Sequence, residues 1–148
     1  MQKTKHIAII GGDARYLPLI HALKTIDHLS IRILGFEQVE QSYTGVMQST
    51  IENLDTSQLD GVILPITGID DDGFVETMFS NEKIQLTEEW FQSLPKDCIV
   101  FTGISNQKLD QHISNNRLHL IKLMERDDVA IYNSIPTAEG AIMLAIKH

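Results

Sequence analysis

The stretch His6-Ile7-Ala8-Ile9-Ile10-Gly11-Gly12-Asp13-Ala14-Arg15 decides the fold class of this chain of 148 residues. Its apolar, β-branched first half is typical of a strand that is buried on both faces of a parallel sheet. The glycines then allow a tight turn, and a helix is predicted from Ala14 to about Asp27, where apolar side chains recur at helical spacing. A strand, a turn and a helix in this order indicate an α/β fold.

Further strand-like runs follow along the chain, each bounded by turn residues. Helix starts lie between them: Ser105 or Asn106 can cap a helix to about Asn115, and Thr87 precedes two glutamates that suit the positive end of a helix. We therefore expect a flavodoxin-like or Rossmann-like open sheet of about five mostly parallel strands, with helices on both faces. The expected strands are His6–Ile10, Ile31–Phe36, Gly61–Ile66, Cys98–Thr102 and Leu118–Leu123.

Composition and charge exclude several classes of protein. The formal net charge is −8 and Lys and Arg form no stripe, so we expect no nucleic-acid partner. No apolar run reaches the roughly 20 residues that span a bilayer, and no signal peptide is recognisable, which favours a cytoplasmic protein. Cys98 lies in an apolar run and is interpreted as a buried, unreactive thiol. The six histidines are dispersed and the turn Asp70-Asp71-Asp72-Gly73 lacks the ligand spacing of a calcium loop, so no metal site is predicted.

The C-terminal segment has a different character from the rest. Pro136 suits the first turn of a helix, and the residues from Ala141 to Ile146 are apolar on nearly every side. A helix of this kind is buried on more than one side, so either a further domain follows His148 or the helix forms a homodimer. We expect residues 1–148 to be a single domain taken from a larger protein.

Ligands of open α/β sheets bind outside the carboxyl ends of the strands, so the loops there carry the candidate site. Gly11 and Gly12 permit either the close approach of an anion or a tight turn capped by Asp13, and the sequence leaves both open. The loop does not match the dinucleotide fingerprint. Ser105 resembles a nucleophile elbow, but Gln107 replaces its second glycine, which favours a helix cap. The absence of a carboxylate after Leu64 excludes a phospho-receiver domain.

A second polar loop is expected after the last strand. There Arg126 either belongs to an ion-pair network that holds the loop or binds a substrate carboxylate, since a guanidinium matches a carboxylate bidentately. Asp13 or Asp127 would orient an arginine or accept a proton, and no catalytic residue is assigned. The candidate substrate-binding residues are Arg15, Asn106, Arg126, Asn133 and Thr137, supported by Gly11, Gly12, Asp13 and Asp127.

Several segments together resemble a known family. They end in a long and specific run, from Glu125-Arg126-Asp127-Asp128 through Asn133-Ser134-Ile135-Pro136-Thr137 to Gly140. In this order they resemble the N-terminal domain of the A subunit of dipicolinate synthase over essentially the whole chain. The earlier segments are Ile10-Gly11-Gly12-Asp13-Ala14-Arg15, Gly35-Phe36, Ile63-Leu64-Pro65, Phe79-Ser80-Asn81-Glu82 and Phe101-Thr102-Gly103-Ile104-Ser105-Asn106.

The resemblance implies an oxidoreductase subunit that works with a flavoprotein-like B subunit. Together they would oxidise a dihydrodipicolinate-type dicarboxylate to dipicolinate, with NAD or NADP as hydride acceptor, in the mother-cell cytoplasm of a sporulating bacterium. In the family a nucleotide-binding Rossmann domain follows this segment, so we expect this chain to be the substrate-side half, to bind no cofactor and to be inactive alone. The alternative is a non-catalytic module that binds a small anion or docks the subunits.

Overall fold

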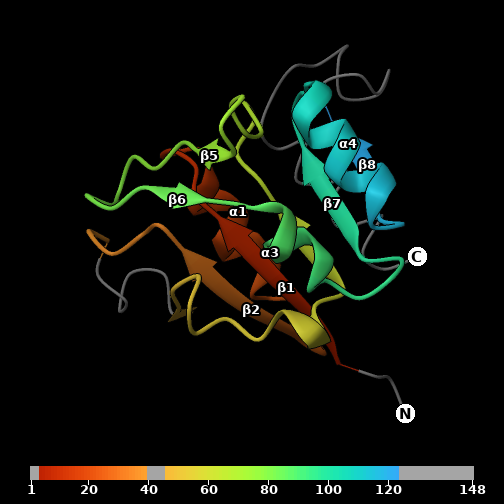
Figure 1. Ribbon diagram of the computed structural model, residues 1–148. Helices are drawn as coiled ribbons and strands as arrows, with labels where there is room; N and C mark the ends of the chain where they lie inside the picture. The colour runs from red at the N-terminus through yellow and green to blue at the C-terminus, as the bar shows by residue number, and fades with distance from the viewer. Residues whose placement is uncertain (1–3, 40–45, 124–148) are drawn as a thin grey trace.

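The computed structural model describes residues 4–39 and 46–123, which form an α/β fold around one parallel sheet (Figure 1). The sheet has six strands in the order β3-β2-β1-β4-β7-β8, and every neighbouring pair is parallel. This confirms the expected class, the open sheet and the five expected strands. The strands are β1 Lys5–Ile10, β2 Leu29–Leu34, β3 Met47–Gln48, β4 Gly61–Ile63, β7 Ile99–Thr102 and β8 His119–Lys122.

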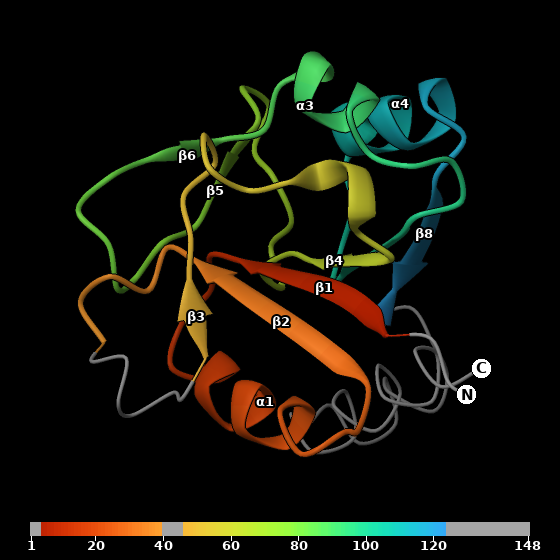
Figure 2. The same ribbon diagram turned by 90° about the horizontal axis from the view of Figure 1, so that it is seen from below.

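Alternate side chains of the strands enter two separate cores. In β1, Ile7 and Ile9 face the helix α1, Tyr16–Leu23, whereas Ala8 and Ile10 face the opposite layer. Figure 2 shows α1 on one face of the sheet and the helices α3, Glu88–Gln92, and α4, Gln107–Asn115, on the other. Helices therefore cover both faces, as the pattern predicted.

The helix α1 is shorter than predicted at both ends. Arg15 is its N-terminal cap residue, and Lys24 to Ile26 continue only as separate turns. Pro18 is tolerated because it lies in the first turn, where a backbone N–H has no partner within the helix. The four buried side chains keep the expected spacing: Tyr16, Leu19, Ile20 and Leu23.

Both predicted caps on the second face are confirmed. The Thr87 hydroxyl accepts a hydrogen bond from the amide of Trp90 at 3.2 Å, and the Asn106 side chain accepts one from the amide of Leu109 at 2.9 Å. Each cap satisfies an amide that the first helical turn leaves unpaired. The cap of α4 is therefore Asn106 rather than Ser105.

A small hairpin interrupts the alternation of strands and helices. Its strands, β5 Phe74–Val75 and β6 Ile84–Gln85, are antiparallel and lie outside the main sheet. Figure 1 places them at the end of the sheet toward which β1 and β2 point. The connection before β4 contains only a short 3₁₀ turn, η1 Thr56–Gln58. The hairpin thus covers part of the sheet edge where ligands of such folds bind.

Candidate functional site

The carboxyl edge between β1 and β4 is the switch point of the sheet. From β1 the chain adds β2 and β3 on one side, and then β4, β7 and β8 on the other. The connections therefore leave β1 and β4 in opposite directions, and ligands of open α/β sheets bind at such a point. Arg15 reaches this edge from the β1 turn, and Thr67 reaches it from the turn after β4.

The glycine turn after β1 is closed by backbone hydrogen bonds. The amide of Gly11 donates to the Leu34 carbonyl and that of Gly12 to the Glu76 carbonyl, each at 2.8 Å. The amide of Met78 in turn donates to the Gly12 carbonyl at 3.2 Å. Gly11 has a φ of +70°, and a Cβ there would overlap the Glu76 carbonyl oxygen.

Because these amides already have partners, they cannot cradle a phosphate. Of the two interpretations left open by the sequence, the structure favours the tight turn over the anion cradle. Asp13 is not the helix cap that was expected: the cap residue is Arg15, without a side-chain cap hydrogen bond, and the Asp13 carboxylate accepts the hydrogen bond of the Arg15 amide at 3.0 Å. The same geometry does not fit the pyrophosphate of a dinucleotide, which needs free amides in the turn after the first strand.

Asp13 and Arg15 form a bidentate ion pair on this edge. The Arg15 Nε lies 3.0 and 3.1 Å from the two Asp13 carboxylate oxygens, and Nη2 lies 2.7 Å from Oδ2. The hydrogen bonds from Arg15 hold the pKa of Asp13 below its ordinary value, and the bonds to Asp13 raise the pKa of Arg15. The Arg15 side chain is 51% exposed and that of Asp13 only 16%. The carboxylate therefore fixes the direction of an arginine that remains open to solvent.

Tyr16 joins the head of α1 to the end of β4 across the switch point. Its buried hydroxyl donates to the Leu64 carbonyl at 2.9 Å, and burial raises the pKa of the phenol. Its ring covers Gly12, since a Cβ at that glycine would lie 2.6 Å from the Tyr16 Cδ2 atom. Tyr16 therefore links the start of α1 to the segment that follows β4.

Glu76 and Thr67 also lie at this edge, although the sequence analysis did not single them out. The Thr67 hydroxyl donates to Glu76 Oε2 at 3.4 Å, and both side chains are exposed. Glu76 comes from the hairpin and reaches the site through its backbone bond to Gly12. No local motif signals this placement. The one available signal was the turn Pro65-Ile66-Thr67 at a strand end.

The remaining predicted residues divide into two groups. The amide of Asn106 is engaged at both ends, because its Oδ1 accepts from Leu109 and its Nδ2 donates to the Ile69 carbonyl at 2.8 Å. This accounts for Asn106 as a structural residue, and its contact with a substrate stays a prediction. Ser105 donates to Asp110 Oδ1 at 2.7 Å, as part of the helix start. Four predicted residues lie outside the described ones, and their roles stay predictions: Arg126, Asp127, Asn133 and Thr137.

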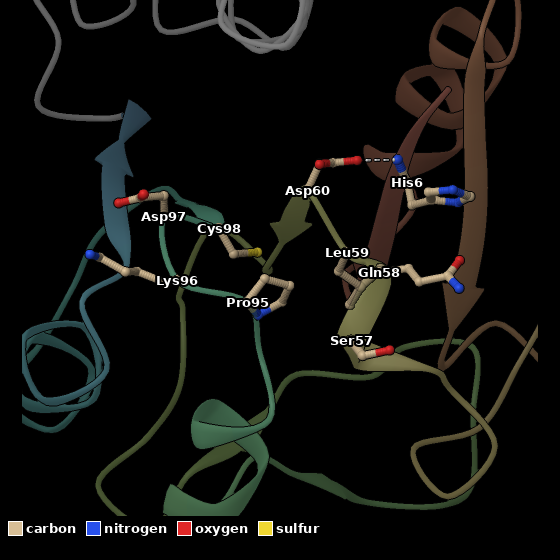
Figure 3. A pocket seen from close by; sticks show the side chains of 9 residues that line it. All are labelled: His6, Ser57, Gln58, Leu59, Asp60, Pro95, Lys96, Asp97 and Cys98. Atoms are coloured by element: carbon tan, nitrogen blue, oxygen red, sulfur yellow. Dashed lines mark hydrogen bonds between the residues drawn. The ribbon is translucent and has the colours of Figure 1, made fainter. Parts of the chain in front are cut away.

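A hollow of about 530 Å³ lies at the opposite, amino edge of the sheet (Figure 3). Asp60 and Asp97 line it with Lys96 as the one lysine or arginine, and the Asp60 carboxylate accepts the amide of His6 at 2.8 Å. Cys98 is 2% exposed at its wall, and burial raises the pKa of the thiol to about 12, so the thiol is protonated at neutral pH, in agreement with its predicted lack of reactivity. The acidic lining does not suit a dicarboxylate.

Within residues 4–39 and 46–123, no three His, Cys, Asp or Glu side chains come together as a metal site would require. None of the helices in the same ranges has the length and apolar character needed to cross a membrane.

The chain is similar to proteins of one family over its whole described length. Residues 6–124 match the family model described as the N-terminal domain of the A subunit of dipicolinate synthase. The dipicolinate synthase A subunit of Bacillus subtilis (strain 168) is 44% identical over 142 residues, which cover 96% of this chain and 48% of that protein. The chain thus spans about half the length of this curated relative.

Solved structures lead to the same family. The crystal structure of the dipicolinate synthase A subunit from Bacillus halodurans aligns with a TM-score of 0.83 and 49% identity, over 99% of this chain and 50% of that one. The structure of the A chain of dipicolinate synthase from Bacillus subtilis also aligns with a TM-score of 0.83, at 42% identity, over 100% of this chain and 49% of that one.

Proposed function

The chain belongs to the family of N-terminal domains of the dipicolinate synthase A subunit, and from that premise we propose that it forms the substrate-side half of an oxidoreductase that makes dipicolinate. The substrate would be a dihydrodipicolinate-type dicarboxylate. Its oxidation removes two electrons and two hydrogens, one as a hydride and one as a proton, and leaves an aromatic pyridine ring. The work of this chain would be to bind the ring and orient it.

The observation that carries the proposal is the oriented guanidinium of Arg15 at the switch point. A dicarboxylate needs local positive charge in a chain whose formal net charge is −8. Arg15 provides it at the edge of the sheet where ligands bind, and Asp13 holds it in a single direction. Arginine suits this task because its planar fork matches a carboxylate bidentately. Arg126 is proposed as the second carboxylate partner.

The hydride acceptor would be a nicotinamide held outside this chain. The amides of Gly11 and Gly12 are already paired with the Leu34 and Glu76 carbonyls, so these two glycines do not offer the free amides that a pyrophosphate needs. We propose that a further nucleotide-binding domain of the same polypeptide holds the cofactor and that a B subunit completes the enzyme. Sporulation and the mother-cell cytoplasm are the corresponding physiological setting.

The test is reconstitution of the reaction. A full-length protein that contains this chain, combined with its B subunit, should convert dihydrodipicolinate to dipicolinate when NAD or NADP is supplied. Ultraviolet absorption should show that the pyridine product and the reduced nicotinamide form in equal molar amounts. Product formation that does not change when the nicotinamide is omitted would contradict the proposed oxidant, and no product under any condition would contradict the activity.

A further inference from the structure

We propose that Glu76 and Arg15 form a two-charge recognition site for a ring that carries a carboxylate beside an N–H group. The proposal rests on the function proposed above and specifies it, because Glu76 would distinguish a reduced or protonated ring nitrogen from the pyridine nitrogen of the product. Arg15 would take the carboxylate, and Glu76 would accept the N–H.

The Arg15 guanidinium has two hydrogen-bonding edges, and Asp13 occupies only one of them. A guanidinium offers a side edge, Nε with one terminal nitrogen, and an end edge, formed by its two terminal nitrogens. Asp13 occupies the side edge through Nε and Nη2. Among the described residues Nη1 takes part in no hydrogen bond, and the Arg15 side chain is 51% exposed. A ligand carboxylate can therefore bind the end edge without displacing Asp13.

The Glu76 carboxylate likewise has one oxygen bonded to a neighbour and one oxygen available to a ligand. Thr67 holds its Oε2 atom at 3.4 Å, and within the described ranges Oε1 takes part in no hydrogen bond. The backbone of Glu76 is fixed because its carbonyl accepts the Gly12 amide at 2.8 Å, three residues before Arg15. Asp13 thus holds the Arg15 guanidinium, and Thr67 holds the Glu76 carboxylate. The hydrogen bond between the Gly12 amide and the Glu76 carbonyl keeps the two segments that carry these charges together.

The negative charge of Glu76 makes this site unsuitable for a ligand that offers carboxylates alone. The Glu76 carboxylate interacts with Arg15 and adds to the rise of the Arg15 pKa, so it also repels any second carboxylate that approaches. A ligand with carboxylates alone would lose affinity there. A ligand that also offers an N–H or a cationic nitrogen would gain a charge-assisted hydrogen bond instead.

Two exposed apolar residues lie on segments whose backbones are bonded to the turns that carry the pair. Met78 is 54% exposed, and its amide donates to the Gly12 carbonyl. Ile104 is 49% exposed, and its amide donates to the carbonyl of Ile66, the residue before Thr67. Apolar side chains near a few placed polar groups are typical of small-molecule sites, so these two residues are the candidates to contact the faces of the ring.

The test compares two ligands that differ at the ring nitrogen. Piperidine-2,6-dicarboxylate has a cationic ring nitrogen, whereas pyridine-2,6-dicarboxylate has an aromatic nitrogen without a hydrogen. In calorimetric titrations of the chain in metal-free buffer, the piperidine compound should bind more tightly by about tenfold or more, the effect of one charge-assisted hydrogen bond. Glu76→Gln should remove this preference, and Arg15→Gln should weaken both ligands.

Glu82→Gln is the matched control, because Glu82 is an exposed carboxylate of the same hairpin loop and has no part in the proposed site. It should leave the preference unchanged. If Glu76→Gln weakens both ligands equally, or leaves the preference intact, the role of Glu76 is refuted while the carboxylate site at Arg15 stands. If Arg15→Gln changes the binding of neither ligand, the substrate site proposed above is itself refuted.

Discussion

The Nδ1 atom of His112 contacts the Glu88 carboxylate, and this contact joins α4 to α3 on the outer face of the sheet. The His112 ring is buried and stacks on Phe91, with ring centroids 4.4 Å apart. Its other nitrogen, Nε2, is buried without a hydrogen-bond partner among the residues that the structure describes. The carboxylate therefore provides the one hydrogen bond of this ring within that part of the chain.

Acid should weaken this contact. The hydrogen bond from His112 lowers the pKa of Glu88 below its ordinary value of 4.5. A carboxylate with a lowered folded-state pKa contributes stability above its unfolded pKa, and this contribution is lost as the pH falls through the folded value. Glu88→Gln should therefore reduce the melting temperature at neutral pH and lose less on acidification to about pH 3 than the unchanged chain does.

The exposed Glu89→Gln is the control for that experiment, since it changes the same charge one position along α3. Its melting temperature should follow that of the unchanged chain across the pH range. Parallel pH profiles for Glu88→Gln and the unchanged chain would show that the contact with His112 does not contribute.

Tyr16→Phe tests the link across the switch point. The substitution keeps the ring but removes the hydroxyl that donates to the buried Leu64 carbonyl. A buried carbonyl without its partner costs about 1–3 kcal/mol, which urea denaturation can measure. Thr25→Val removes an exposed hydroxyl bonded to the Ala22 carbonyl and should cost much less. Equal costs for the two variants would contradict the role of Tyr16.

Gly11→Ala tests the closed turn. At a φ of +70° any other residue costs about 1–3 kcal/mol, and here the new Cβ would also overlap the Glu76 carbonyl oxygen. Gly35→Ala is the matched comparison, because Gly35 has a φ of +85° but its nearest neighbours lie 3.2 Å from the added atom. The unfolding free energy should fall further for Gly11→Ala. A smaller loss at Gly11 would show that the hairpin segment can move away from the turn.

The sheet was predictable because its signal is local and repeated. The strands at Ile7 and Val100 lie in apolar runs bounded by turns, and burial on both faces needs no more than that. β3 was missed because it has two residues, and its Met47 is 55% exposed, so it has no apolar pattern. Its pairing with Arg32 and Ile33 depends on the neighbouring strand.

The site was predictable only where it follows strand ends. Arg15 was found because the turn after the first strand lies at a known edge of such folds. Glu76 was not found, because a hairpin of two short strands brings it to Gly12 from 64 residues away, and no local pattern encodes that pairing. The interpretation of Gly12 as an anion cradle or a turn could not be decided from the sequence, since it depends on whether another segment takes its amide.

The ion pair of Asp13 and Arg15 provides the test that separates a substrate site from a structural one. In the assembled enzyme Arg15→Ala should raise the apparent KM for the dicarboxylate by about 30-fold, the lower end expected for a charged contact, because the side chain is half exposed. Arg15→Lys should recover part of this, because lysine keeps the charge but not the fork. Asp13→Asn should have a smaller effect, since it frees Arg15 to rotate without removing it. The KM for the nicotinamide should not change in any of the three variants.

The stability of the same variants is the control. An exposed pair contributes about 0–1 kcal/mol to folding, so the melting temperatures should remain close to that of the unchanged protein. A large fall in melting temperature with normal kinetics would instead identify the pair as a structural brace of the β1 turn.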